Sequence, residues 1–177
     1  MTLSPSESDW WDEDLADEWD RTELARCSGE GANRAGLGGP SCVVVAKVGG
    51  DERHLLEATL EQSGFTVVPA GDGVEALEMV CAVGPDAIIA DLDGRDLDGV
   101  VLCRVLRGLR AHARLPVLVL TSARGSTDRA RTLRGLGGVW VIRKPVGSAE
   151  IAGALSQMLS MVGAPATPSP ARRTASP

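Results

Sequence analysis

Residues 87–99 read Ala-Ile-Ile-Ala-Asp-Leu-Asp-Gly-Arg-Asp-Leu-Asp-Gly, and this stretch decides how the chain is expected to fold. Four apolar residues lead directly to Asp91, and the acidic loop that follows ends at Gly99. A short apolar run bounded by turn residues is typical of a fully buried strand. In open parallel sheets, functional groups lie just beyond the carboxyl ends of the strands. Asp91 is therefore the first candidate for a functional residue.

The same pattern occurs on both sides of this stretch, where apolar runs alternate with amphipathic segments. The expected strands are residues 42–48, 65–68, 87–90, 117–120 and 139–142. The expected helices are residues 51–63, 72–83, 99–110, 127–136 and a last one that begins at 148. Strict β-α alternation predicts a doubly wound, five-stranded parallel sheet with helices on both faces, in the flavodoxin-like order.

Helix ends and buried faces are predicted from local patterns. Asp51 is expected to cap the first helix, whose buried face would carry Leu55, Leu56, Thr59 and Leu60. Asp72 followed by Glu75 resembles a capping box, and the helix it opens should stop at Gly84-Pro85. Ser148 is expected to cap the last helix, which would bury Ile151, Leu155, Met158 and Leu159.

The segments outside residues 41–162 differ from this pattern. Residues 1–40 contain ten acids and three arginines, a net charge of −7, whereas residues 41–177 carry +1. Within this acidic arm, Trp11, Leu15 and Trp19 are spaced to form one apolar helical stripe, and a Gly-rich linker follows over residues 28–40. Residues 163–177, rich in Pro, Ala, Ser and Thr, are predicted to be a disordered tail.

Composition excludes several classes of protein. The acidic N-terminus is unlike a secretory signal, and no apolar run approaches the roughly 18 residues that span a bilayer. A near-neutral folded region is no basis for nucleic-acid binding across the chain. The four cysteines show neither metal-site spacing nor a disulfide framework, so we expect reduced thiols. A cytoplasmic protein without membrane contact is the expectation.

Three polar side chains follow expected strands at the carboxyl edge of the sheet. Asp91 follows the third strand, Thr121 the fourth and Lys144 the fifth, with Pro145 after Lys144. A carboxylate can attack a phosphoryl group to form an acyl phosphate. A hydroxyl and an ammonium are suitable partners for the phosphoryl oxygens. The pattern indicates phosphoryl transfer to a carboxylate.

The order of elements and these motifs resemble the receiver domain of bacterial response regulators over residues 41–162. The phosphorylation loop Asp91 to Gly99, the Ser-Gly-Phe at residues 63–65 and the Pro-Val-Leu-Val-Leu-Thr-Ser at residues 116–122 carry the resemblance. It implies that Asp91 accepts phosphate from a histidine kinase or phosphotransfer protein. It further implies that Thr121 and Lys144 bind the phosphoryl group, that Lys144-Pro145 is cis, and that the backbone carbonyl of Asp93 is a metal ligand.

The chain departs from that family at the end of the first strand. Receivers carry two adjacent acids there that hold Mg²⁺, and this chain has Lys47 and Val48 instead. Neither side chain supplies the oxygen ligands that Mg²⁺ requires, so Mg²⁺ binding is expected to be weak or absent. Lys47 either pairs with Asp91 in the place of the metal or extends into solvent. Val141, with Trp140 beside it, stands where the family usually has an aromatic residue, so an aromatic switch is not expected.

Two functions remain open. The first is a stand-alone receiver in a two-component phosphorelay that signals by protein contact to an unknown output protein. The second is a phosphorylation-independent pseudo-receiver that acts as an interaction module. An enzyme is not expected, because the strand-end loops are short and offer no general base or cofactor loop. The arginines over residues 104–134 form either a solvated face or a surface that binds the acidic arm or another acidic partner.

Overall fold

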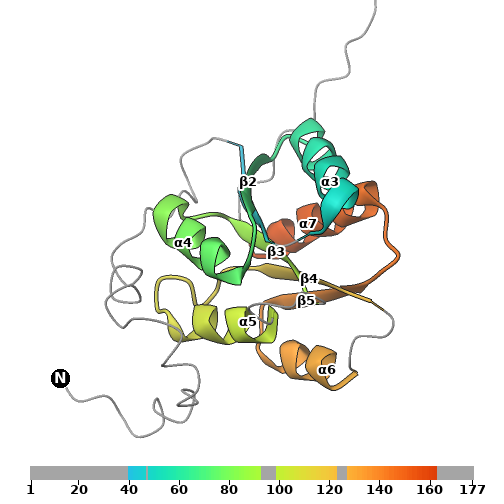
Figure 1. Ribbon diagram of the computed structural model, residues 1–177. Coiled ribbons are helices and arrows are strands. Elements are labelled where there is room, and N and C mark those ends of the chain that lie inside the picture. Colours follow the sequence, from blue (N-terminus) through green and yellow to red (C-terminus); the bar gives the residue numbers. More distant parts are fainter. Residues whose placement is uncertain (1–39, 47, 93–98, 123–126, 163–177) are drawn as a thin grey trace, which may run out of the picture.

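The computed structural model describes residues 40–46, 48–92, 99–122 and 127–162, and these residues form one α/β unit (Figure 1). The strands are β1 (Cys42–Ala46), β2 (Thr66–Ala70), β3 (Ala87–Asp91), β4 (Val117–Thr121) and β5 (Val139–Arg143). The helices are α3 (Gly50–Gln62), α4 (Gly73–Val83), α5 (Gly99–Gly108), α6 (Thr127–Gly135) and α7 (Ser148–Val162). The arm, residues 1–39, and the tail, residues 163–177, lie outside the described residues, so their predicted states stay predictions.

All strand pairs are parallel, and the sheet order is β2-β1-β3-β4-β5. The switch in strand order lies between β1 and β3. From β1 the chain adds β2 on one side of the sheet, and then it crosses to the other side of β1 to add β3, β4 and β5 in turn. The predicted doubly wound, flavodoxin-like sheet is confirmed. The switch in strand order places the end of β3, and with it Asp91, at the position where such sheets carry their functional sites.

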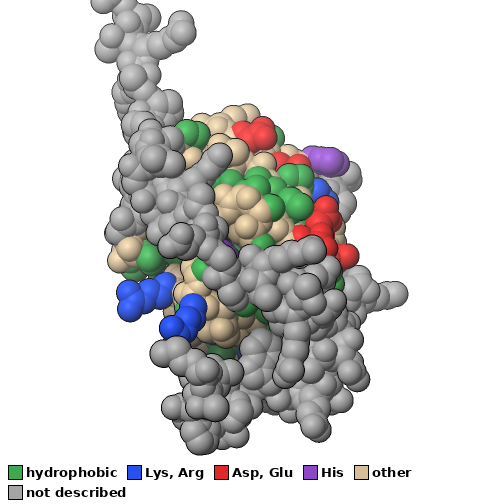
Figure 2. All heavy atoms as spheres, turned by 90° about the vertical axis from the view of Figure 1, so that its left-hand side faces the viewer, with side chains coloured by type: hydrophobic (Ala, Val, Ile, Leu, Met, Phe, Trp, Pro, Cys, Tyr) green, Lys and Arg blue, Asp and Glu red, His purple; other side chains and the backbone are tan. Residues whose placement is uncertain are grey.

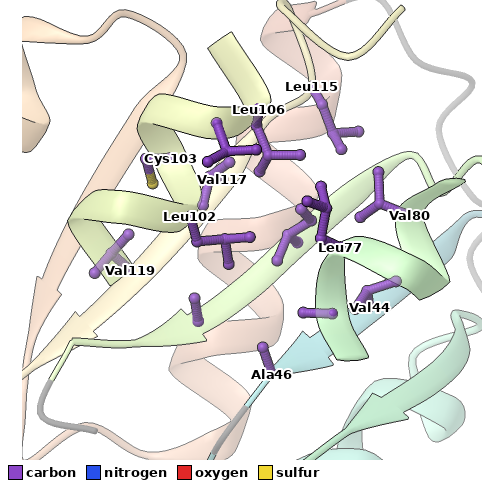
Figure 3. Packing of buried hydrophobic residues seen from close by; sticks show 14 of the residues in the cluster. Val44, Ala46, Leu77, Val80, Leu102, Cys103, Leu106, Leu115, Val117 and Val119 are labelled. Carbon is purple, nitrogen blue, oxygen red and sulfur yellow. The ribbon is translucent and has the colours of Figure 1, made fainter. Parts of the chain in front are cut away.

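Helices cover both faces of the sheet, with α4, α5 and α6 on one face and α3 and α7 on the other (Figure 1). Alternate residues of each strand point to opposite faces. Val44 of β1 therefore lies under α4 and α5, whereas Val43 and Val45 lie under α3 and α7. Figure 3 shows the first cluster, in which Leu102 and Leu106 of α5 and Leu77 of α4 converge on the strands. Continuous apolar strands such as β1 are explained by burial on both sides.

Helix α4 is bounded as the sequence predicts. The Asp72 carboxylate accepts a hydrogen bond from the Glu75 backbone N–H at 2.8 Å. The Glu75 side chain accepts from the N–H of Gly71 instead of that of Asp72, so the box is shifted by one residue. Gly84 ends the helix with φ +56°, a left-handed conformation that favours glycine.

Three local predictions are wrong. Gly49 is the N-cap of α3, with no side-chain cap, so Asp51 is not the capping residue. Leu55 is 62 % exposed, because the buried face of α3 is narrower than the predicted one and carries Leu56 and Leu60. The Ser148 hydroxyl lies 2.9 Å from that of Thr59, so it joins α7 to α3, and the Gly147 carbonyl accepts from the first turn of α7.

The cysteine prediction is correct for two residues and wrong for a third. Cys42 and Cys103 are buried thiols that form no disulfide, and Cys103 belongs to the apolar cluster under α4, α5 and α6. Cys81 is disulfide-bonded, which contradicts the expectation of four reduced thiols. No helix within the described part of the chain is long and apolar enough to cross a membrane.

Candidate functional site

The candidate site lies at the carboxyl edge of the sheet, where β3, β4 and β5 end side by side. Asp91 is the last residue of β3 and is in register with Leu120, directly before Thr121. Thr121 is in register with Arg143, directly before Lys144. The Lys144 backbone N–H donates to the Thr121 carbonyl at 2.7 Å, which fixes the start of the loop after β5. Parallel pairing alone therefore brings these three residues to one edge.

The Asp91 carboxylate and the Lys144 ammonium form an ion pair through Asp91 Oδ2. The Asp91 side chain is 9 % exposed and that of Lys144 22 % exposed, so the pair is largely shielded from water. Charge-assisted hydrogen bonds of this kind are stronger than those between neutral groups. The ammonium thus places a positive charge directly beside the candidate nucleophile.

Thr121 is buried, with 3 % of its surface exposed. Its hydroxyl donates to the neighbouring Ser122 carbonyl at 3.3 Å, which is long for a hydrogen bond between oxygens. A hydroxyl held so loosely can turn toward a new acceptor at little cost. The peptide bond between Lys144 and Pro145 is cis, as the family resemblance implies.

Glu52 of α3 also lies at the site, although no sequence motif pointed to it. Its carboxylate Oε2 lies 4.0 Å from Lys144 Nζ, on the side of the ammonium that faces α3. Its side chain is 76 % exposed, so the contact is weaker than that to Asp91. The available signal was its position in the first turn of the helix after β1, because that turn begins at the same sheet edge as the site.

Val48 is buried, with 5 % of its surface exposed, among the apolar residues beneath α3 and α7. It lines a pocket of about 160 Å³ beside the ion pair, together with Glu52, Leu55, Leu56, Lys144 and Val146, among others. The exposed Leu55 forms part of the rim of this pocket. Mostly apolar walls thus surround the ammonium on the α3 side.

The described residues do not fit a magnesium site of the usual kind. The Val48 side chain has no oxygen to offer, and Asp91 Oδ2 is engaged by Lys144. No group of three or more His, Cys, Asp or Glu side chains that could hold a metal ion occurs in the described ranges. Lys47 and Asp93 lie outside those ranges, so the predicted pairing of Lys47 with Asp91 and the predicted carbonyl ligand of Asp93 stay predictions.

The two residues at the expected switch position lie on opposite faces of β5, as strand alternation predicts. Trp140 packs under α3 and α7, and Val141 packs under α4, α5 and α6. His112 is a buried polar residue outside the regular helices and strands. It is 6 % exposed in the turn after α5, and burial lowers its pKa.

Comparison with known proteins agrees with this geometry. The family model described as "Response regulator receiver domain" matches residues 50–156. The response regulator MprA of Mycobacterium ulcerans is 42 % identical over 81 residues, which is 46 % of this chain and 34 % of that protein. MprA of Mycobacterium leprae is 42 % identical over 81 residues, 46 % of this chain and 35 % of that protein. The chain thus matches about a third of the length of these relatives.

Solved structures give the same result. A putative response regulator from Chloroflexus aurantiacus is 26 % identical with a TM-score of 0.62, covering 68 % of this chain and 98 % of that chain. The receiver domain of sensor histidine kinase PA1611 from Pseudomonas aeruginosa, which has a magnesium ion coordinated in its active site cleft, is 25 % identical with a TM-score of 0.60 over the same shares. The chemotaxis protein CheY4 of Vibrio cholerae, at 22 % identity and a TM-score of 0.61, shares the fold. The chain belongs to the response regulator receiver domain family of two-component systems.

Proposed function

We propose that this receiver accepts a phosphoryl group on Asp91 from a histidine kinase or phosphotransfer protein and signals by protein contact. The observation that supports it most is the shielded ion pair of Asp91 with Lys144, beside the buried hydroxyl of Thr121. Positioning and charge neutralisation are the main protein contributions to phosphoryl transfer. The three residues supply a nucleophile, a counter-charge and a hydrogen-bond donor.

In the proposed step, an Asp91 carboxylate oxygen attacks the phosphorus of the donor. The bond from phosphorus to the donor nitrogen or oxygen breaks, and the leaving group keeps the electron pair. The product is an aspartyl phosphate. The Lys144 ammonium then moves from the carboxylate to the phosphoryl oxygens, and the Thr121 hydroxyl turns from the Ser122 carbonyl to the same group. The long 3.3 Å contact of that hydroxyl makes the exchange inexpensive.

No step in this proposal passes through a metal. Val48 and the engaged Asp91 carboxylate leave the described residues a poor set of Mg²⁺ ligands. The Lys144 ammonium supplies one positive charge where a typical receiver adds a divalent ion as well. Transfer is therefore expected to be slow with small phosphodonors and only weakly dependent on Mg²⁺.

The output and location of the protein are part of the same proposal. In this proposal, phosphorylation changes which partner protein the receiver surface binds. The receiver acts as a non-enzymatic binding module, and its location is the cytoplasm. Direct nucleic-acid or membrane binding is not proposed for it. The alternative, a pseudo-receiver whose surface is permanently active, is an outcome of the test that follows.

The test is incubation with acetyl phosphate or phosphoramidate, with and without Mg²⁺, read by intact mass. An added mass of one phosphoryl group, lost in Asp91→Asn and much reduced in Lys144→Met, supports the proposal. Asp86→Asn is a matched control, because Asp86 accepts a hydrogen bond from the Cys42 N–H at 2.7 Å, away from the ion pair. No adduct at any metal concentration, and none with a panel of histidine kinases, would favour the pseudo-receiver.

A further inference from the structure

The receiver is divided into an acidic half and a basic half. Residues 41–98 contain twelve acids and three bases, a net charge of −9. Residues 99–149 contain one acid and ten bases, a net charge of +9. The first half includes α3 and α4, and the second includes α5 and α6. The near-neutral total thus conceals two strong charges of opposite sign.

Five of these ten bases lie on one surface, which we call the α5–α6 surface. Helices α5 and α6 lie side by side on one face of the sheet (Figure 1). The exposed arginines that define this surface are Arg104, Arg110, Arg114, Arg131 and Arg134. Figure 2 shows one side of the molecule, on which acidic side chains gather at the upper right and basic ones at the lower left.

Arg107 is oriented differently from these residues and serves the fold. Its Nε donates to the Gly137 carbonyl at 3.0 Å and its Nη2 to the Gly138 carbonyl at 3.1 Å. The guanidinium thus ties α5 to the turn between α6 and β5. This contact fixes the relative position of the two helices that carry the α5–α6 surface.

The acidic arm joins the receiver at the sheet edge where α5 and α6 end. Strand β1 begins there at Cys42, one strand from β3 and two from β4. The turn after α6 reaches the same edge, because the Gly138 carbonyl accepts from the N–H of Val117, the first residue of β4. Neighbouring strands are about 4.8 Å apart, and β5, which follows α6, is three strands from β1, so α6 ends roughly 15 Å from the start of β1. A Gly-rich linker of about 13 residues spans on the order of 20 Å, which covers this distance.

We propose that the acidic, tryptophan-bearing segment at residues 9–26 binds the α5–α6 surface of the same chain. Residues 1–40 carry −7, so the acidic α3 repels the segment and the arginines of α5 and α6 attract it. Trp11, Leu15 and Trp19 form one apolar stripe when this segment is helical, and indole rings stack well on guanidinium groups. Charge selects the surface, and the tryptophans anchor the segment on it.

The chain has two lysines, which permits a sharp cross-linking test on the full-length protein. Arg134→Lys keeps the charge of the α5–α6 surface and adds one amine there. A carbodiimide then couples that amine only to carboxylates in direct contact, and peptide mass mapping locates the bond. Arg53→Lys on α3 is the matched control. Glu57 lies within 2.7 Å of Arg53, so local coupling to Glu57 shows that the reagent works.

The proposal expects cross-links from position 134 to carboxylates of residues 9–26, and none from position 53 to that segment. A mixture of isotope-labelled and unlabelled protein should show these bonds within one copy, and 0.5 M NaCl should reduce their yield at least five-fold. The proposal is overturned if position 134 gives no bond to the segment while position 53 couples to Glu57. Equal coupling from both positions, or bonds mainly between copies, would also overturn it.

Tryptophan fluorescence gives an independent readout. Three of the four tryptophans belong to the arm. Arg131→Glu combined with Arg134→Glu should raise their quenching by acrylamide about two-fold. Arg172→Glu combined with Arg173→Glu changes the net charge equally in the C-terminal tail and should leave quenching unchanged. Equal quenching in both double variants would contradict binding at the α5–α6 surface.

Discussion

Removing Lys144 is the most informative perturbation of the site, because it leaves the Asp91 carboxylate shielded and without its counter-charge. Two unit charges about 4 Å apart interact by roughly 4 kcal/mol at an effective dielectric near 20. The free energy needed to remove water from the two charged groups offsets part of this attraction. Exposed pairs contribute up to about 1 kcal/mol, whereas breaking a buried pair costs about 3–5 kcal/mol. With side chains 9 % and 22 % exposed, this pair lies between those limits. Lys144→Met is expected to destabilise the receiver by about 2–3 kcal/mol.

Asp91→Asn should lower the free energy of unfolding by less than about 1 kcal/mol, because the amide oxygen of Asn still accepts a hydrogen bond from the Lys144 ammonium. The ammonium also retains Glu52, whose carboxylate lies 4.0 Å away. The double variant Asp91→Asn/Lys144→Met removes both charges, so it should be more stable than Lys144→Met alone. The resulting coupling energy in the cycle is expected to be about 2 kcal/mol.

Urea unfolding followed by far-UV circular dichroism measures all four proteins of this cycle. With an m-value near 2 kcal/mol/M, Lys144→Met should lower the midpoint by about 1–1.5 M. Glu52→Gln is the control, since its exposed contact to Lys144 should change the midpoint by less than about 0.5 M. A coupling energy within about 0.3 kcal/mol of zero would refute the pairing of Asp91 with Lys144, and with it the main support for the proposed function.

Three further predictions concern other parts of the receiver. Burial lowers the pKa of His112, so its stabilising contribution is complete above the ordinary pKa near 6.5 and is lost as the pH falls toward the lowered value. His112→Leu should therefore flatten the pH dependence of the free energy of unfolding below about pH 6.5, which urea midpoints at several pH values will show, and an unchanged pH dependence would contradict the burial of His112. Gly138→Ala should lower the melting temperature more than Gly137→Ala does. Both residues have φ near +60°, but only a Cβ at Gly138 would lie 3.2 Å from Arg107 Nη2. Equal melting temperatures for the two variants would mean that the Arg107 contact to this turn is not formed. Val48→Asp should lower the free energy of unfolding in the absence of metal. If the variant binds Mg²⁺ with a dissociation constant near 2 mM, 10 mM Mg²⁺ should restore about 1 kcal/mol of that free energy, whereas the unaltered protein should respond little. An equal response in both proteins would contradict the poor fit for Mg²⁺.

Much of the fold was predictable from local patterns. Strands buried on both faces are continuous apolar runs, and the carboxylate that follows β3 marks the functional edge whatever the details of the helices. Asp72 and Gly84 bound α4 as predicted, because capping depends on neighbours only a few residues away. The placement of Asp91, Thr121 and Lys144 at one edge also follows from strand order, since parallel strands end at the same side of the sheet.

Other features depend on packing between distant segments. Leu55 and Leu56 are equally apolar, and only the packing of α3 against α7 and the sheet decides that Leu56 is buried while Leu55 lies at the rim of the pocket. His112 is polar and follows α5, so its sequence indicates exposure. Its burial results from the way the turn before β4 folds under neighbouring elements.

The α/β alternation, the five strands and the three polar residues at their ends follow from the sequence, because each depends on local apolar periodicity and on the common direction of parallel strands. Three features required the folded structure: the pairing of Lys144 with Asp91, the approach of Glu52 to within 4.0 Å of the same ammonium, and the pocket beside them. Side chains from β3, α3 and the loop after β5 meet there across large separations in the chain. Their contacts depend on how the helices pack on the sheet and on how much water is excluded between them. Neither can be predicted from a local stretch of sequence.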